Sequence, residues 1–267
     1  MKQVTATIIS HTHVGGDFRE MALQATGLPQ AQPGQFANLQ VTPGVDPLLR
    51  RPLSIYYQDV KRERLHFLYQ VVGRGTRLLS RRAVGDELSI LAPLGRGFSL
   101  EGLNTDSLAI LVGGGAGAAP LYFLAEILQQ RKIPTLFFLG GPSRESLSFT
   151  DKMANLLGGD LVISTDDGSL GKPGFVTAAL RDFFLRSPGK GPRHLFACGP
   201  DGMLKEVAAL AKRTGVPLQV SLEAVMACGF GACLGCVCPV VDKDKKEVEY
   251  RRVCTEGPVF SSREVTL

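Results

Sequence analysis

The stretch Val112-Gly113-Gly114-Gly115-Ala116-Gly117-Ala118-Ala119-Pro120 decides how the middle of this sequence folds. It follows an apolar run over residues 108–112 and precedes a helical pattern over 120–130. Glycines between a strand and a helix allow a tight turn, and they let a pyrophosphate approach the backbone at the positive end of the helix. We therefore predict nucleotide binding by Gly113, Gly114, Gly115 and Gly117. A purely structural tight turn is the alternative.

Around this stretch, apolar strand-like runs alternate with helical runs. Strands are expected over 108–112, 135–139, 161–165, 194–198 and 218–222, and helices over 120–130, 174–185 and 202–214. Strands that alternate with helices build a parallel sheet covered on both faces. The pattern predicts an α/β parallel-sheet nucleotide-binding domain over residues 101–222.

Two of the expected strands end in residues suited to a nucleotide, because an open α/β sheet binds its ligand at the carboxyl ends of its strands. Asp166 follows one strand, and its carboxylate would accept hydrogen bonds from a ribose diol and repel a 2′-phosphate, which favours NAD over NADP. An ordinary Asp-Gly turn is the alternative, and Arg144 argues for the phosphate. Cys198 and Gly199 end the next strand and should face the cofactor, unless Cys198 is a buried structural residue.

The first hundred residues have a different pattern, with short runs broken by Gly and Pro. Strands are expected over 5–9, 36–41, 53–57, 65–72 and 87–90, which is typical of a small antiparallel β-barrel. Arg51 and Ser54 lie on one edge of a strand, where Arg51 could pair with a phosphate and Ser54 could hydrogen-bond a flavin ring. A strand with a solvated arginine is the simpler interpretation. Gly75 and Thr76 begin a helix-like segment that offers a second phosphate-type N-terminus.

The six cysteines all lie after residue 197. Cys228, Cys233 and Cys236 follow the spacing C-x4-C-x2-C, and Cys254 comes 17 residues after Cys236. This is the plant-type spacing of four thiolates around a 2Fe–2S cluster. A zinc site is the alternative, although zinc sites more often use two separate C-x2-C pairs. Residues 223–267 are therefore predicted to form a small cluster-binding module that ends in a charged hairpin around Asp242–Glu249, with Cys238 left spare.

Composition excludes several classes of protein. The chain has 267 residues, 44% of them hydrophobic and 21% charged, which is ordinary for a folded protein and argues against extended disorder. Its net charge of +5 is scattered, so a nucleic-acid stripe is not expected. No apolar run approaches the roughly 18 residues that a membrane span requires, and no signal-peptide core is visible. The expected location is the cytoplasm.

Taken together, these motifs resemble the ferredoxin–NAD(P) reductase superfamily, in the same order and over nearly the whole chain. Within it, the segments Met226–Cys236 and Val253–Phe260 are similar to the electron-transfer subunits of type B dihydroorotate dehydrogenases. The resemblance implies NAD on the α/β half, four cysteine ligands for the cluster and FAD on the barrel of residues 1–100. The residues that it assigns to FAD are Arg51, Pro52, Leu53, Ser54, Leu68, Tyr69, Gln70, Gly75 and Thr76. Leu53 departs from the aromatic residue that many superfamily members have at this position.

The resemblance also implies a function. A nicotinamide exchanges two electrons as hydride and an iron–sulfur cluster passes one at a time, so a flavin converts between them. The chain offers no credible acid or base for dehydrogenating a pyrimidine, so no catalytic residue is expected and an FMN-containing catalytic subunit must act as partner, in a heterotetramer. Electrons would run from dihydroorotate to FMN, then through the cluster and FAD to NAD+. The alternatives are a related subunit of an NADH-dependent ferredoxin–NADP oxidoreductase or a sulfhydrogenase, or a zinc-stapled nucleotide-binding regulatory protein without redox turnover.

Overall fold

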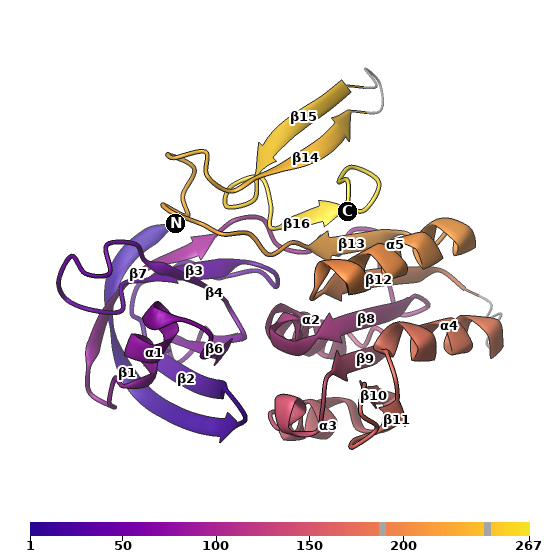
Figure 1. Ribbon diagram of the computed structural model, residues 1–267, viewed down its shortest axis with the longest axis horizontal. Helices are drawn as coiled ribbons and strands as arrows, with labels where there is room; N and C mark the ends of the chain where they lie inside the picture. Colours follow the sequence, from indigo (N-terminus) through magenta and orange to yellow (C-terminus); the bar gives the residue numbers. More distant parts are fainter. Residues whose placement is uncertain (187–190, 243–246) are drawn as a thin grey trace.

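A computed structural model of the chain describes residues 1–186, 191–242 and 247–267. Two seven-stranded sheets lie side by side, and a two-stranded hairpin projects from the face where they meet (Figure 1). Both halves have the predicted fold class, with an antiparallel half-barrel first and a parallel α/β sheet second. Among the described residues, no helix is long and apolar enough to span a bilayer.

The first sheet is entirely antiparallel, in the order β4-β3-β7-β1-β2-β6-β5. Its elements are β1 (Lys2–Gly15), β2 (Phe18–Gln24), β3 (Phe36–Leu39), β4 (Arg51–Ser54), β5 (Tyr57–Asp59), β6 (Arg64–Gln70), α1 (Arg74–Ser80) and β7 (Glu87–Leu94). Side-chain alternation shapes it: along β7, Leu88, Ile90 and Ala92 are buried while the residues between them are more exposed. This inward-facing set forms the barrel core.

One expected strand, 53–57, is wrong. The chain breaks there into β4 and β5 because its backbone changes partners: Ile55 N donates to Gln35 O at 3.0 Å, whereas Tyr56 N donates to His66 O at 2.9 Å. The two short strands thus lie at opposite edges of the sheet.

The second sheet has the order β11-β10-β9-β8-β12-β13-β16 and is parallel except for β16. Its strands are β8 (Leu108–Gly114), β9 (Thr135–Gly141), β10 (Leu161–Thr165), β11 (Lys172–Pro173), β12 (Arg193–Cys198), β13 (Leu218–Ser221) and β16 (Val259–Ser261). The helices are α2 (Ala118–Gln130), α3 (Asp151–Leu157), α4 (Val176–Arg186) and α5 (Asp201–Thr214), with single 3-10 turns η1 (Gly115–Gly117), η2 (Glu145–Leu147) and η3 (Gly158–Asp160).

Alternate residues of the central strand β8 serve the two faces of this sheet. Ala109 and Leu111 point into the cluster with α2 and α3, and Ile110 and Val112 into the cluster with α4 and α5. Successive strands run outward from β8 in one direction through β9 and β10, and from β12 in the other through β13. The carboxyl ends of β8 and β12 therefore form the topological switch point, where such sheets bind ligands.

Helix α2 joins the two halves. Tyr56 of the barrel stacks on Tyr122 of α2 with ring centroids 4.4 Å apart, and Phe18 contacts Phe149 at 4.7 Å. Lys152 forms an ion pair with Glu20 across the same boundary. The barrel and the α/β sheet therefore share one packed interface.

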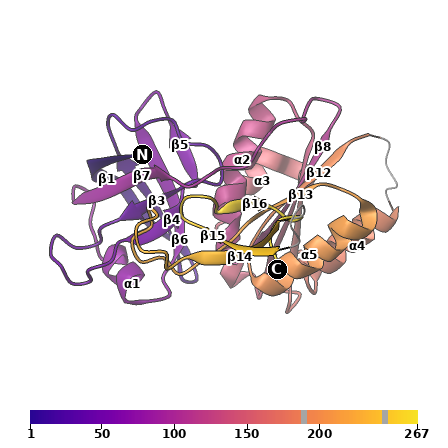
Figure 2. The same cartoon turned by 90° about the horizontal axis from the view of Figure 1, so that it is seen from above.

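After β13 the chain forms the cysteine loop, the hairpin of β14 (Val237–Asp242) and β15 (Glu247–Arg252), and then β16. The expected hairpin is present, and its tip at 243–246 lies outside the described residues. β16 pairs with β13, with Val220 opposite Phe260, so the last part of the chain returns to the α/β sheet. Figures 1 and 2 show the cysteine loop passing over β3 and β4. The division at residues 100 and 222 stays a prediction.

Candidate functional site

The glycine turn lies where β8 meets α2, as predicted, but its four glycines do different things. Gly114 and Gly115 line a cavity, and Gly115 has a φ of +52°. Gly113 lies within the sheet, and a Cβ there would meet Phe137 and Leu139. Gly117 packs against the end of β12, where a Cβ would lie 2.1 Å from the backbone oxygen of Cys198.

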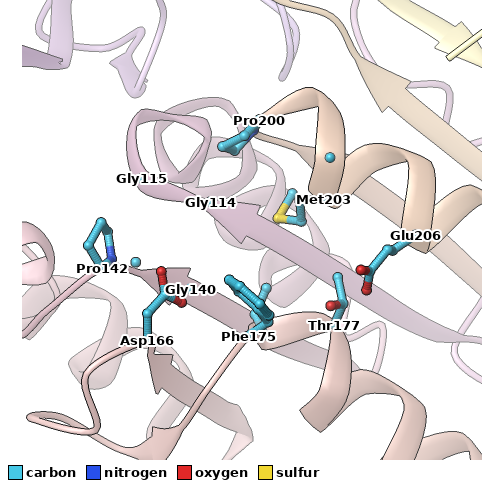
Figure 3. Close-up of a pocket in the computed structure, with 13 residues that line it drawn as sticks. Gly114, Gly115, Gly140, Pro142, Asp166, Phe175, Thr177, Pro200, Met203 and Glu206 are labelled. Atoms are coloured by element: carbon cyan, nitrogen blue, oxygen red, sulfur yellow. The ribbon is translucent and has the colours of Figure 1, made fainter.

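The first cavity, of about 390 Å³, opens at the carboxyl ends of β8, β9 and β10 and at the start of α5 (Figure 3). The Asp166 carboxylate lies on one side of the space and the Glu206 carboxylate on the other. Pro200, Gly202 and Met203 also line the cavity, and they belong to the turn after Cys198 that was expected to face the cofactor. The lining residues outside the predicted motifs are Gly140, Gly141, Pro142, Phe175, Val176, Thr177 and Glu206. Of these, only the run Gly140-Gly141-Pro142 could have been recognised from the sequence, because glycines and a proline directly follow the apolar residues of β9.

Residues near Asp166 clarify its predicted role. Arg144, which argued for a 2′-phosphate, is instead tied to the turn after Asp166, since its Nε donates to Ser169 O at 3.1 Å. Asp167 is also used within that turn, where its Oδ1 accepts from Ser169 N and Oγ. Those hydrogen bonds lower the pKa of Asp167. Asp166, by contrast, lines the cavity.

The second cavity, of about 320 Å³, lies between the barrel and the α/β half. It brings together eight predicted residues, namely Pro52, Leu53, Ser54, Leu68, Tyr69, Gln70, Thr76 and Cys198. The remaining lining residues are Phe36, Val72, Ala116, Ala119, Ser221, Leu222, Glu223, Ala224, Met226 and Pro258. Most of these come from segments that are remote in sequence from the barrel motifs, so no local pattern could have identified them.

Arg51, Gly75 and Gly199 are predicted residues that do not line this cavity. Arg51 lies directly on Gly75, where a Cβ would be 1.8 Å from the Arg51 Nε. Gly199 packs on the glycine turn, since a Cβ there would lie 3.0 Å from Gly114 N. Without a side chain, Gly75 lets Arg51 pack against the start of α1, and Gly199 lets the β12 turn pack against the glycine turn.

The hydroxyl of Tyr69 is hydrogen-bonded to the ring of His11. The His11 Nδ1 is 2.8 Å from Arg82 O and its Nε2 is 2.7 Å from the Tyr69 hydroxyl. Because a carbonyl only accepts, Nδ1 carries the proton in the neutral ring and Nε2 accepts from Tyr69. Burial lowers the pKa of His11, which favours this neutral form.

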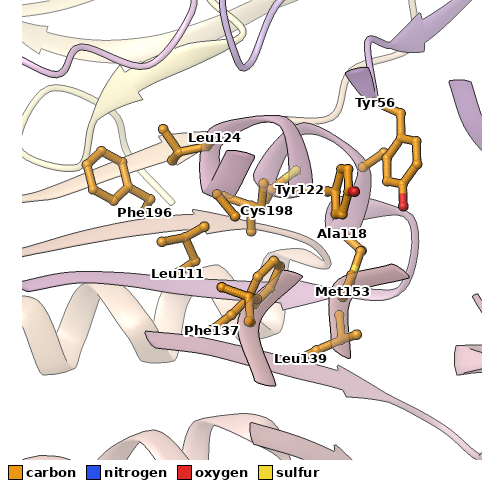
Figure 4. Packing of buried hydrophobic residues seen from close by; sticks show 14 of the residues in the cluster. Tyr56, Leu111, Ala118, Tyr122, Leu124, Phe137, Leu139, Met153, Phe196 and Cys198 are labelled. Carbon is orange, nitrogen blue, oxygen red and sulfur yellow. The ribbon is translucent and has the colours of Figure 1, made fainter. Parts of the chain in front are cut away.

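Cys198 contributes its turn to the second cavity, but its thiol is buried. Figure 4 shows the side chain in the hydrophobic cluster that includes Leu111, Leu124 and Phe137. Burial, with a further contribution from the charge of Glu223, raises the pKa of this thiol to about 12. It is therefore neither a thiolate nucleophile nor a ready metal ligand.

The four predicted ligand cysteines gather in one loop region as two pairs. The Cys228 thiol interacts with that of Cys233, and the Cys254 thiol with that of Cys236. No three of the described His, Cys, Asp or Glu side chains converge as ligands of one metal ion. Two thiolate pairs are what a 2Fe–2S cluster requires, because each of its irons takes two of the four cysteines. Four thiols gathered in one loop region are the donor set that such a cluster requires.

The backbone of the loop favours thiolates. Burial alone would raise the pKa of Cys228, but the Phe230 N–H, the Cys233 thiol and the N–H groups of Cys233 and Ala232 together outweigh it and lower the pKa to about 6. Gly235 N also points at the Cys233 Sγ, at 3.5 Å. These donors can stabilise the negative charge of a reduced cluster.

Burial and the neighbouring Cys236 raise the pKa of Cys254 to about 12, so the Cys254 thiol needs a metal's positive charge to lose its proton. The fifth cysteine of this region, Cys238, lies on β14, where burial and the charge of Cys236 raise its pKa, and it lies outside the C-x4-C-x2-C spacing.

Comparisons with known proteins agree with this geometry. The family model described as "Iron-sulfur cluster binding domain of dihydroorotate dehydrogenase B" matches residues 223–266, and "Oxidoreductase NAD-binding domain" matches 111–209. The electron transfer subunit of dihydroorotate dehydrogenase B (NAD(+)) from Bacillus cereus (strain B4264) is 35% identical, with 100% of each chain covered. This chain belongs to that family. The corresponding subunit from Geobacillus kaustophilus is 42% identical over 88% of this chain and 87% of its own.

A solved structure of an NADH-dependent reduced ferredoxin–NADP oxidoreductase is also similar to this member of the dihydroorotate dehydrogenase B family. Its TM-score is 0.83 at 27% identity, and the alignment covers 98% of this chain and 89% of that one. The two proteins thus share their fold over nearly the whole of this chain. The lower identity makes this second family, which the sequence left as an alternative, the less supported assignment.

Proposed function

We propose that this chain carries electrons between an FMN-containing dihydroorotate dehydrogenase catalytic subunit and NAD+, as the electron-transfer subunit of an oxidoreductase of pyrimidine biosynthesis. The observation that supports the proposal is that one chain holds three neighbouring sites: a nucleotide cavity, a flavin cavity and a loop with four gathered cysteines. Met226 lines the flavin cavity and Cys228 begins the cysteine loop two residues later. The cytoplasm, where pyrimidine precursors are made, is the proposed location.

Residues of the second cavity would hold FAD. Ser54, Gln70 and Thr76 place polar groups on its wall, while Phe36, Leu53 and other apolar residues exclude water from it. Arg51 packed on Gly75 provides a cation at the start of α1, suited to the pyrophosphate. When bound, the flavin supplies the conversion between hydride and single-electron transfer.

Residues of the first cavity would hold NAD. The turn at Gly114 and Gly115 lets the backbone approach a pyrophosphate, and Asp166 accepts hydrogen bonds from the ribose diol. The two cavities share the β12 turn, since Pro200 lines the first and Cys198 the second. A nicotinamide bound in the first cavity can therefore reach a flavin bound in the second.

Replacing Asp166 by asparagine should weaken discrimination against NADP. Loss of a charged hydrogen-bond acceptor should raise the KM for NADH about tenfold, and loss of the repulsion should improve NADPH use. The ratio of kcat/KM for the two nucleotides, measured by flavin reduction, tests this. Asp167→Asn is the matched control, because Asp167 is engaged with Ser169 and should leave the ratio unchanged. An unchanged ratio in Asp166→Asn would remove Asp166 from the ribose site.

The partner subunit is proposed to dock on the hairpin face, which we define as Val237, Val241, Val248 and Tyr250. These side chains share one side of the β14–β15 ladder and are 38–69% exposed. Exposed apolar surface of this kind marks interaction sites, and the cysteine loop adds the exposed Phe230 and Leu234 beside it.

Tyr250→Glu should weaken association with the catalytic subunit by about tenfold or more, since exposed tyrosines that a partner covers are frequent interface hot spots. Isothermal titration or co-purification of the two subunits measures the loss. Val60→Glu, at an exposed valine on the barrel, is the control. Equal weakening by both variants, or by neither, would contradict docking on this face.

The proposed function is tested by visible spectroscopy of anaerobically purified protein before and after NADH, with iron, zinc and flavin assayed on the same sample. About one FAD and two irons per chain, both centres bleached by NADH, are expected. A protein that contains zinc and no flavin, or a flavin that NADH does not reduce, would refute the proposal. Co-purification with an FMN-containing subunit then identifies the enzyme that the chain serves.

A further inference from the structure

Asn38 is a buried polar residue on the outer face of the barrel, and only 1% of it is exposed. Its neighbours on β3, Ala37 and Leu39, point into the barrel core, while Phe36 packs with Cys236 and Cys254. Because side chains alternate along a strand, Asn38 shares the face of Phe36. It therefore points away from the barrel core and toward the cysteine module.

The Asn38 amide holds the first cysteine of the loop. Its Nδ2 donates to the backbone oxygen of Cys228 at 2.8 Å. The contact is close enough to restrict the next residue, because a Cβ on Gly229 would lie 2.5 Å from Nδ2. Gly229 also has a φ of +75°, which favours glycine independently. The barrel and the cysteine loop are thus fitted together at this point.

The same residue lies between two segments of the flavin cavity wall. On one side it pairs with Pro52 in the β3–β4 ladder, and Pro52 lines the cavity. On the other side it holds Cys228, two residues after Met226, which also lines the cavity. One side chain thus connects the wall of the flavin cavity to the first of the paired cysteines.

Fold stability does not explain an amide at this position. The Asn38 Oδ1 is buried and has no hydrogen-bond partner among the described residues. A buried acceptor left unpaired destabilises the folded state, so an apolar residue of similar size would suit the barrel at least as well. What an apolar residue could not do is donate to Cys228.

We propose that Asn38 is a positioning residue that fixes Cys228 against the β3–β4 strand pair and so sets the placement of the cluster relative to the flavin. This inference rests on the proposed function. The residue takes no part in hydride transfer between NADH and flavin. It acts on the following step, in which one electron at a time passes between flavin and cluster, because that step depends on a fixed separation of the two centres.

The test compares Asn38→Leu and Asn38→Asp with the parent chain, each purified anaerobically with FAD and cluster. Both variants lose the donor, and the aspartate also brings a negative charge toward the Cys228 carbonyl. Loss of one buried hydrogen bond should make iron release to a chelator about tenfold faster in Asn38→Leu, and faster still in Asn38→Asp. Stopped-flow mixing with NADH should show unchanged flavin reduction and slower cluster reduction. The electron paramagnetic resonance spectrum of the reduced cluster should also change.

Gln58→Leu is the matched control. Gln58 is an amide on β5, at the opposite edge of the barrel sheet, and it holds a loop through Ala31 N at 2.6 Å and Pro29 O at 3.2 Å. Its removal should leave iron release, cluster reduction and the resonance spectrum at parent values. If Asn38→Leu fails to fold, the near-isosteric Asn38→Asp still tests the loss of the donor, with the effect of its added charge on top.

Parent-like iron release and cluster reduction in both Asn38 variants would overturn the inference, as would equal changes in Gln58→Leu. If the parent protein binds FAD and a 2Fe–2S cluster and the Asn38 variants behave like the parent, only the proposed role of Asn38 is refuted. If the parent protein contains no cluster, both the proposed function and this inference are refuted.

Discussion

Replacing Cys236 by serine is expected to remove the iron–sulfur cluster and to stop electron transfer to a partner, while NADH still reduces the flavin. Cys236 is 4% exposed and is held through both its thiol and its backbone. Its Sγ accepts from Cys254 N at 3.4 Å, its backbone oxygen accepts from Val253 N at 2.8 Å, and its thiol interacts with that of Cys254. One substitution therefore disrupts a thiolate pair and the contact between the loop and the end of β15.

The expected loss is large. Removing residues that only orient metal ligands lowers metal affinity or activity by roughly 10–100-fold, so removing a ligand should lower dihydroorotate-dependent NAD+ reduction by about 100-fold or more. Iron content should fall in parallel. NADH-dependent flavin reduction should remain, because no cysteine of the loop lines the NAD cavity.

Cys238→Ser is the control for this substitution, since Cys238 is also a cysteine of the module but lies outside the C-x4-C-x2-C spacing. It should retain iron and activity. If Cys238→Ser lost the cluster and Cys236→Ser kept it, the ligand assignment would have to be exchanged.

Gly117→Ala is expected to destabilise the whole chain. The added Cβ would lie 2.1 Å from Cys198 O and 2.4 Å from Cys198 C, which are backbone atoms at the shared turn of the two cavities. No side-chain rotation can relieve that contact, so α2 and β12 must separate. Overpacking a close contact costs 1–3 kcal/mol and occasionally more, and here we expect about 3 kcal/mol.

For a chain of this size such a loss should lower the melting temperature by about 5 °C. Differential scanning fluorimetry measures it, and FAD content should fall as the cavity widens. Gly159→Ala is the control, because a Cβ there has nothing within 4 Å. A melting temperature equal to that of the parent would show that the turns tolerate separation and that Gly117 is present for the ligand alone.

Much of the fold follows from local pattern. The helix predicted over 120–130 is α2, Ala118–Gln130, and that predicted over 202–214 is α5, Asp201–Thr214. In α5 the buried residues Leu204, Val207, Leu210 and Ala211 form an apolar stripe with the helical period, whereas α2 is buried nearly all round along Ala118–Ala125. The family, the fold class, the oxidoreductase function and the set of FAD, 2Fe–2S cluster and NAD are confirmed by relatives that align over the full length.

What the sequence could not show is long-range contact. The helix α3 was not predicted, because Asp151–Leu157 is a single short segment with a weak pattern. Phe36 and Met226 line one cavity although 190 positions separate them, and Asn38 reaches Cys228 across the same gap. Such pairs depend on how the barrel, the α/β sheet and the cysteine module pack together. No spacing within one segment encodes that packing.

Because β16 pairs with β13, the cysteine module cannot be removed from the end of the chain without removing a strand of the α/β sheet. A strand at the edge of a sheet exposes unpaired N–H and C=O groups that invite association with other chains. Here Val259–Ser261 covers the edge at β13, and Phe260 is buried in the core beneath it. The cysteine module is therefore enclosed between two strands of one sheet and cannot be cut away as a detachable unit. A chain shortened before the module would leave β13 as the edge strand and would uncover the part of the core that Phe260 fills.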